Sequence, residues 1–236
     1  MGQPTKGTSK NINNKHEKIM ALICSCPAAT SIPDVANVAC EESFGQIQKA
    51  AFCRLNSAAG TPNKFTSTAS ILLKASWSTK LAATDGTKIV VTPYIYAPAD
   101  SGGEPRVSSG GNDDLGGIPM VLGEQPIQFQ GQLRGIPQAV ATALKELACE
   151  ANAGNLGVFL FDENGRIECI AGSTTGDYLP IPIRGFYVGS KLHGNYDAKD
   201  YNLLQWNYAE NYSNGLVIVT PTDFNPLTDL TNASNT

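Results

Sequence analysis

The chain has 236 residues, carries charged side chains at 16% of its positions and has a formal net charge of −4. Soluble proteins usually carry charges at about 25% of positions, so this surface must be built mainly from uncharged polar residues. The small negative balance excludes a strongly basic reader of nucleic acid. The composition also excludes a coiled coil and a highly charged disordered chain.

The first 18 residues are polar and contain one strongly apolar residue beyond Met1, Ile12. A segment with so little to bury is expected to be disordered alone and to order against a partner. The apolar run at residues 19–24 is too short for the core of a conventional signal peptide, and no run approaches the ~18 residues of a membrane helix. The sequence therefore predicts folding in the cytosol.

Six cysteines could form disulfides, bind a metal or remain free: Cys24, Cys26, Cys40, Cys53, Cys149 and Cys169. An even number is compatible with a disulfide framework, and the first four could bind zinc. Their spacing, C-x-C-x13-C-x12-C, lacks the closely spaced pairs typical of zinc sites. Free thiols that pack as small apolar groups are the favoured interpretation, with zinc or a disulfide among the first four as the alternative.

The predicted elements of the first half are short. Residues 43–51 are predicted as a helix because Phe44, Ile47 and Ala51 share one helical face, although residues 51–55 could continue as a strand. Residues 69–84 are predicted as helix or turn. Residues 88–95 are predicted as a strand from their β-branched run, and Pro93 indicates an edge or a bulge there.

Residues 97–117 contain six glycines and two prolines, which predict a long loop. A structureless loop of about 20 residues is uncommon inside a compact domain and is usually functional or bound to a partner. We therefore expect this loop and the N-terminal arm, residues 1–18, to be assembly contacts. Residues 127–133 alternate in hydrophobicity, which predicts a half-buried strand.

The clearest helix is predicted over residues 137–152. Pro137 suits the first helical position, and Gly154 suits the left-handed conformation that ends a helix. The stripe predicted to face the core consists of Ile136, Val140, Ala143, Leu144, Leu147 and Ala148.

The C-terminal part is predicted to be strand-rich. Residues 156–161 and 166–171 flank an Asp-Glu-Asn-Gly turn and predict a hairpin. Residues 178–188 are extended, with two prolines that indicate an exposed or edge position, and residues 201–209 place Leu204, Trp206 and Tyr208 on one face. Residues 216–220 are the last predicted strand. We thus expect an N-terminal segment at 1–31, a single β-rich domain at 32–221 and a polar tail at 222–236.

The sequence has no catalytic signature. His16 lies in the polar arm and His193 in a glycine-rich loop, where a solvated side chain is the simplest interpretation. Residues 172–176 could bind an anion and residues 110–114 could bind calcium, but both are typical turn sequences. A carbohydrate site is a further alternative, built from Asp197, Asp200, Tyr201, Trp206, Tyr208, Glu210 and Asp223. We predict a protein that is not an enzyme, with no catalytic residue, cofactor or metal.

Four segments together resemble virion proteins of tailed phages that infect Bacteroidota. They are Ile-Pro-Ile-Arg-Gly-Phe-Tyr-Val-Gly-Ser at 181–190, the stretch at 208–230, Thr-Lys-Ile-Val-Val-Thr-Pro at 87–93 and Gly-Gly-Asn-Asp at 110–113. The order of strands, single helix and long loop is similar to that of phage tail tube proteins.

The resemblance implies a β-rich α+β fold, in which two packed antiparallel sheets form a barrel-like sandwich with one flanking helix and long assembly loops. It implies a structural subunit that assembles into stacked hexameric rings in the cytoplasm of a bacterial host and conducts DNA through the lumen of the virion tail. The implied partners are copies of itself, other virion proteins and DNA in passage, without a membrane. A weakly charged, mildly acidic lumen would let DNA slide. A capsid-decorating or head–tail connector protein is the alternative.

Overall fold

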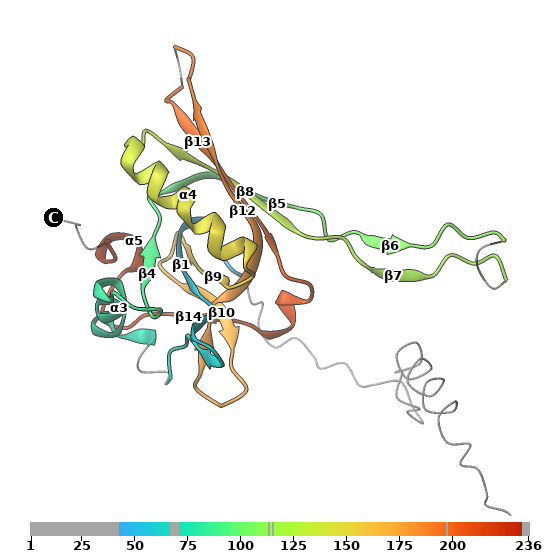
Figure 1. Ribbon diagram of the computed structural model, residues 1–236, viewed down its shortest axis with the longest axis horizontal. Coiled ribbons are helices and arrows are strands. Elements are labelled where there is room, and N and C mark those ends of the chain that lie inside the picture. Colours follow the sequence, from blue (N-terminus) through green and yellow to red (C-terminus); the bar gives the residue numbers. More distant parts are fainter. Residues whose placement is uncertain (1–42, 67–70, 113, 115, 197, 233–236) are drawn as a thin grey trace, which may run out of the picture. The chain divides into compact units, whose positions relative to one another are not determined.

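The computed structural model describes residues 43–66, 71–112, 114, 116–196 and 198–232, all within one compact unit, Ser43–Thr236 (Figure 1). Its elements in chain order are β1 (Ile47–Arg54), β2 (Asn56–Ala58), β3 (Thr61–Pro62), α3 (Lys74–Ala82), β4 (Ile89–Val91), β5 (Ile95–Ser101), β6 (Pro105–Val107), β7 (Val121–Glu124), β8 (Gln128–Arg134), α4 (Gln138–Asn152), β9 (Leu156–Asp162), β10 (Ile167–Ala171), β11 (Tyr178–Leu179), β12 (Ile181–Leu192), β13 (Tyr201–Tyr208), η1 (Tyr212–Gly215), β14 (Leu216–Val219) and α5 (Pro226–Asp229). None of the helices described is long and apolar enough to cross a membrane.

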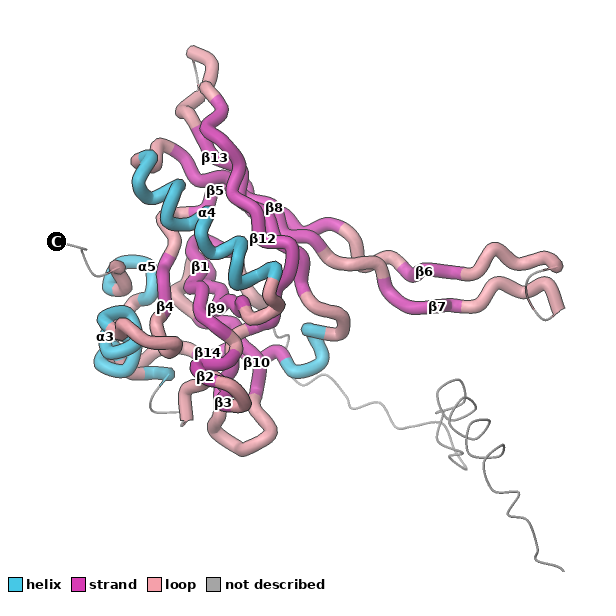
Figure 2. The backbone as a smooth tube through the Cα atoms, in the orientation of Figure 1, coloured by secondary structure: helices cyan, strands magenta, loops and turns pink. Residues whose placement is uncertain are grey.

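Ten strands of this part of the chain join into one antiparallel sheet, which has two sections (Figure 2). The central sheet consists of β4, β1, β9, β10, β14 and β11, and the outer sheet consists of β12, β13, β8 and β5. β12 joins them, because Ile181 and Pro182 pair with β9, whereas the strand pairs with β13 from Ile183 onward. The predicted β-rich fold with two antiparallel sheets is confirmed, and the sheet is open rather than a closed barrel.

Strand β12 has a bulge at Gly185, within the part that pairs with β13. This residue has φ +58°, and the pairing with β13 shifts register between Arg184 and Tyr187. A residue with a side chain is strained in this left-handed region, and a Cβ at Gly185 would lie 3.0 Å from Nδ2 of Asn207. Glycine therefore allows the irregularity in the pairing of β12 with β13.

Replacing Gly185 by alanine is expected to lower the free energy of unfolding by about 1–2 kcal/mol. For a chain of this size that corresponds to a fall in melting temperature of roughly 2–8 °C. Asparagine tolerates the left-handed region better, so Gly185→Asn should lose less. An alanine variant with the same melting temperature as the wild type in a calorimetric scan would contradict this role of Gly185.

Two hydrophobic cores lie on opposite faces of the central sheet. The first fills the space between the two sheets and is closed by α4; its largest members include Phe52, Phe129 and Trp206. The second packs α3 against the other face, with Trp77 against Phe159 and Phe161. Because both faces of the central sheet are covered, every residue of β9 is buried.

The prediction of a helix at residues 43–51 was wrong, because this region contains most of strand β1. Residues Lys49 to Cys53 are all buried, so the segment has neither a helical nor an alternating pattern. Pairing with β9 along Ile47–Arg54 decides the conformation, which local propensity cannot anticipate. The predicted strand at 88–95 is two strands, β4 and the start of β5, with Pro93 in the break.

The prediction of an edge position for residues 178–188 was also wrong. β12 lies between β9 and β13 in the sheet, and Ile181 and Ile183 are fully buried. Pro180 is tolerated because it falls in the break between β11 and β12, where no ladder hydrogen bond is required of it.

The C-terminal residues pack onto the second core instead of leaving the domain. Leu230 is buried there, and the buried Lys49 donates from Nζ to the carbonyl oxygen of Leu227 at 2.6 Å. The side-chain amide of Asn232 accepts from the N–H of Val91 and donates to its carbonyl, both at 2.7 Å. Asn232 thus covers the free edge of β4, which would otherwise invite strand addition.

The helix α4 occupies Gln138–Asn152, and Gly154 follows it with φ +72°, as predicted. The buried stripe differs from the predicted one. Ala141, Leu144 and Ala151 are its buried residues, whereas Ala143 is exposed. Val140, Leu147 and Ala148 are half-buried against the first core, so the predicted stripe faces the core except at Ala143.

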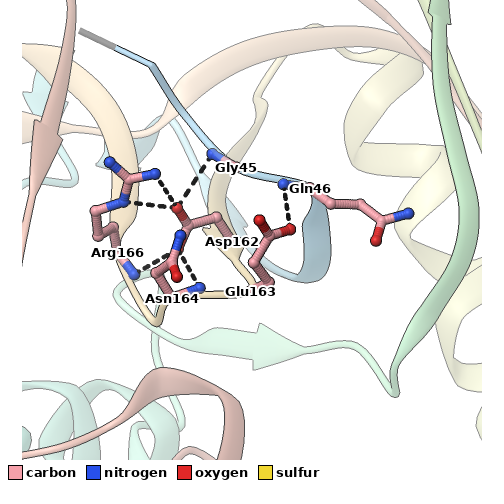
Figure 3. A network of polar contacts seen from close by, with 6 residues as sticks. All are labelled: Gly45, Gln46, Asp162, Glu163, Asn164 and Arg166. Carbon is pink, nitrogen blue, oxygen red and sulfur yellow. Dashed lines mark hydrogen bonds and ion pairs between the residues drawn. The ribbon is translucent and has the colours of Figure 1, made fainter.

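A buried carboxylate anchors the turn between β9 and β10 (Figure 3). Asp162 is fully buried. Its Oδ1 accepts from the backbone N–H groups of Asn164 and Arg166, and its Oδ2 accepts from the N–H of Gly45. The guanidinium of Arg166 donates to the same Oδ2 from Nε at 2.7 Å and Nη2 at 2.6 Å. One side chain therefore holds the turn and the segment that precedes β1 together.

Candidate functional site

The segment predicted as a structureless loop at residues 97–117 is one limb of a long β-hairpin. β5 runs through the first part of it and β6 follows, and both pair with strands that come after the expected loop, β8 and β7. The distal part, residues 102–127, projects away from the two sheets (Figures 1 and 2). We call residues 102–127 the hairpin arm.

Backbone pairing continues from the base of the hairpin arm to its tip. Pro105 lies opposite Glu124 and Val107 opposite Val121. The N–H of Ser108 donates to the carbonyl oxygen of Met120 at 2.8 Å. At the base, a Cβ on Gly102 would lie 2.3 Å from the carbonyl oxygen of Pro126, so only glycine lets the two limbs approach there.

The distal half of the hairpin arm exposes large apolar side chains. They are exposed by 55 to 70% and are Val107, Ile118, Met120, Val121 and Leu122. In an antiparallel ribbon, successive residues of a strand point to opposite faces. Met120 and Val121 pair regularly with Ser108 and Val107, so they place apolar surface on both faces of the arm. No hydrophobic core lies beneath either of them, because neither residue belongs to the two cores of the domain.

An isolated two-stranded hairpin is only marginally stable in water. Contiguous exposed apolar surface on a soluble protein marks an interaction site or an aggregation hazard. Fully burying one such aliphatic side chain is worth about 1.5–3 kcal/mol. The hairpin arm therefore has the properties of a surface that is stabilised when another protein surface covers it.

The exposed apolar surface of the hairpin arm lies mainly outside the loop that the sequence predicts as an assembly contact, residues 97–117. The sequence-based argument rested on glycine, proline and the absence of apolar residues within 97–117. The apolar side chains lie mainly at 118–122, just beyond that boundary. The run Ile-Pro-Met-Val-Leu at 118–122 is the signal that could have found them, since it is apolar and adjoins a glycine-rich turn. The other predicted contact, residues 1–18, lies outside the described residues, as does His16.

His193 is exposed on the connection between β12 and β13. Its ring Nδ1 lies 3.3 Å from Oδ2 of Asp200, and Oδ1 of Asp200 accepts from the N–H of Gly194 at 3.0 Å. Hydrogen bonds from Gly194 and the proximity of His193 lower the pKa of the Asp200 carboxyl below its usual value. The pair closes a turn.

The carbohydrate alternative depended on Trp206 as an accessible platform. The structure buries Trp206 completely, and its ring stacks on Phe129 with 3.9 Å between centroids. Tyr208 is buried beside it, and burial, followed by the charge of Asp100, raises the pKa of the Tyr208 hydroxyl far above its usual value. Asp197 lies outside the described residues. A sugar cannot reach Trp206 or Tyr208, on which this interpretation mainly rested.

The remaining candidate segments form turns. Residues 172–176 connect β10 to β11, where the N–H of Gly172 donates to the carbonyl oxygen of Asp177. In the segment at 110–114, Oδ2 of Asp114 accepts from the N–H of Gly110 at 2.7 Å, and Asp113 lies outside the described residues. In the described part of the chain, no three His, Cys, Asp or Glu side chains lie close enough together to hold a metal ion.

Three of the six cysteines lie in the described part of the chain and are free. Cys53 and Cys169 are buried, and Cys149 is exposed. Burial raises the pKa of the thiols of Cys53 and Cys169 to about 12, so both remain protonated at neutral pH. Cys24, Cys26 and Cys40 lie outside the described residues, and the zinc or disulfide alternative stays a prediction.

The fold and its surface define a β-rich protein with two antiparallel sheets and a projecting apolar hairpin. The sequence matches no family model and no curated protein. Among solved structures, it is similar to a chain from the tail of an empty GTA particle with C6 symmetry, at 12% identity and a TM-score of 0.29. The match covers 53% of this chain and 82% of the other. A TM-score this low does not establish a common fold.

Proposed function

We propose that this protein is a structural subunit of a phage tail tube, which assembles through the hairpin arm into stacked hexameric rings that conduct DNA. The observation that carries the proposal is the hairpin arm, because it presents apolar side chains on both faces far from either core. The sequence resemblance to tail tube proteins supplies the kind of assembly. A second copy is the natural partner, since closed symmetric assemblies of one chain remove exposed strand edges and apolar surface.

The described surface offers open strand edges as well as the arm. β14 pairs with β10 on one side, and β5 pairs with β8 on one side. β14 reads Leu-Val-Ile-Val and is half-buried at all four positions. Edges of this kind are hazards for a monomer and become ordinary sheet positions when neighbouring subunits complete them. Both features support assembly of identical copies over a free enzyme.

Electron microscopy of the purified chain over a range of concentrations tests the proposal. Rings or tubes with sixfold symmetry are the expected result. Threefold or twelvefold particles would instead select a capsid-decorating or connector protein. Monodisperse monomers at every concentration would overturn a self-assembling role altogether.

The hairpin arm itself is tested by the combined variant Ile118→Ser, Val121→Ser and Leu122→Ser. We expect this variant to keep the melting temperature of the domain and to lose its rings, because these side chains contribute to neither core. Tyr196→Ser is the matched control, since Tyr196 is fully exposed on a different hairpin. Assembly that survives the triple change, or that is lost equally in the control, would contradict the assignment to the arm.

A further inference from the structure

The outer sheet has one face against the first core and one face against solvent. Along β13 the residues alternate between half-buried and buried, and the buried ones include Leu204 and Trp206. Residues directly opposite each other in antiparallel strands share a face. The strand register therefore fixes which side chains lie on the solvent side, which we call the outer face.

The outer face consists of side chains aligned in rows across the strands. The rows are Ser101–Gln128–Asn207–Arg184, Ala99–Gln130–Gln205–Tyr187, Tyr96–Gln132–Leu203 and Arg134–Tyr201–Leu192. Glutamine, asparagine and tyrosine make up most of these positions, and none of them is aspartate or glutamate. The guanidinium of Arg184 lies against Gly154, where an added Cβ would be 1.8 Å from its Nη1. Asp100 of β5 lies opposite the buried Phe129 and so belongs to the other face. A chain with more acidic than basic residues, 21 against 17, thus has a carboxylate-free face.

A cavity of about 660 Å³ opens at one end of the outer face. It is lined by Tyr96, Gln132, Arg134, Lys199 and Tyr201 together with small residues. Within the part of the chain that the structure describes, neither Arg134 nor Lys199 forms an ion pair. The cavity therefore presents two uncompensated positive charges beside aromatic rings.

Arg134 is held in place although it is exposed. Its Nε and Nη2 both donate to Oε1 of Gln132, at 3.2 and 3.1 Å. The guanidinium also lies over the ring of Tyr96, with 4.9 Å between its central carbon and the ring centroid. A guanidinium fixed in this way keeps its remaining N–H groups free for a planar anion and loses little conformational entropy on binding.

We propose that the outer face contacts the phosphate backbone of double-stranded nucleic acid, with Arg134 and Lys199 as its cationic contacts. Arginine, lysine, glutamine, asparagine and tyrosine side chains are the groups that contact phosphates and sugars in protein–DNA complexes. Aromatic anchors buried in pockets mark the centre of a protein–protein interface, whereas this face is a ladder of amides. The inference deepens the proposed function by naming the surface that conducted DNA meets.

The number of charges determines the kind of contact. Seven residues of β8 span about 20 Å, along which a duplex presents roughly a dozen phosphates. The two cations at the cavity, Arg134 and Lys199, neutralise few of these phosphates in each subunit. Binding is therefore weak, independent of sequence and easily reversed by salt. This differs from the mildly acidic lumen expected from the sequence. Neutral amide donors with a few fixed cations contact the DNA backbone but bind it weakly enough for the duplex to slide.

Fluorescence anisotropy of a labelled duplex of mixed sequence, titrated with the full chain at several salt concentrations, tests the inference. We expect a plot of log K against log salt with a slope of about −2 for two phosphate contacts. Arg134→Gln and Lys199→Gln should each reduce this slope by about 1 and leave the melting temperature unchanged. Lys88→Gln, which removes an exposed lysine outside this face, should leave the slope unaltered.

No binding to the duplex at low salt, or slopes unchanged in both variants, would overturn the inference. Tighter binding to single-stranded DNA, or displacement of the duplex by polyglutamate of equal charge, would also overturn it. Electron microscopy of the same samples separates the two proposals. Rings without DNA binding would support the assembly role and contradict the DNA contact of the outer face. DNA binding without rings would support the DNA contact and contradict the assembly role.

Discussion

Replacing Asp162 by asparagine is expected to destabilise the domain by about 3 kcal/mol and to lower its melting temperature by roughly 6–12 °C. The side chain is fully buried and accepts from Gly45, Asn164 and Arg166. An amide presents N–H groups where Oδ2 now accepts from the guanidinium and from Gly45. The substitution therefore leaves the Arg166 charge without its partner, which is the costly way to lose a buried ion pair.

The pH dependence of this loss has a definite sign. Burial alone would raise the pKa of the Asp162 carboxyl, but hydrogen bonds from Arg166 and Gly45 outweigh it and hold that pKa below the ordinary value of 3.8. A carboxyl with a lowered pKa stabilises the fold above its unfolded pKa, and this contribution is lost as pH falls through the folded pKa. The stability difference between wild type and Asp162→Asn should be constant at neutral pH and shrink below about pH 4.

Glu163→Gln is the matched control. The carboxylate of Glu163 follows Asp162 in the chain but is exposed, and it accepts a hydrogen bond from a single backbone group, the N–H of Gln46, at 2.6 Å. We expect a loss within about 1 kcal/mol for this change. Chemical denaturation at a series of pH values measures both variants. A difference for Asp162→Asn that stays constant to low pH would show that its carboxylate is not the source of the stability.

The elements that could be predicted from the sequence are those with a local signal. Pro137 and Gly154 mark the ends of α4, and Gly154 indeed has positive φ. The turn at 162–165 predicted the β9–β10 hairpin, where Gly165 has φ +75°. The alternation along β13 correctly placed Leu204, Trp206 and Tyr208 in the core. Each of these depends on residues within a few positions of one another.

The elements that could not be predicted depend on distant parts of the chain. β1 is buried on both faces because Ala50 and Phe52 belong to the first core and Ala51 and Cys53 to the second, which removes any periodicity from its sequence. β12 pairs with β9 at its first two residues and with β13 after them. Its prolines suggested an edge strand because nothing in the local sequence indicates two different neighbours.

The candidate site could be predicted only in part, because it too depends on pairing between distant parts of the chain. The hairpin arm is recognisable as a hairpin only when Val107 is known to lie opposite Val121, across the intervening tip. The outer face requires the register of β5, β8, β13 and β12 to be known together. Composition indicated a weakly charged surface, but only the pairing shows that one face of it lacks carboxylates.

Leu144→Asp is expected to unfold the domain at ambient temperature or to leave it barely stable. Leu144 is 2% exposed in the core between the two sheets. A carboxylate placed there loses its hydration and gains no cationic partner, and the lost packing adds to this cost. The combined loss exceeds about 4 kcal/mol, which is a large share of the 5–15 kcal/mol that stabilises a typical domain.

Ala143→Asp tests the one position of the predicted core-facing stripe of α4 that the structure exposes. Both residues belong to the predicted apolar stripe, but only Leu144 is buried in the structure. The same charge one position earlier should therefore change the free energy of unfolding by less than about 0.5 kcal/mol, the usual effect of a surface substitution. Circular dichroism and thermal melting of the two variants measure the contrast. Equal destabilisation would place Ala143 in the core and contradict its exposed position, whereas an unaffected Leu144→Asp would remove this helix face from the core.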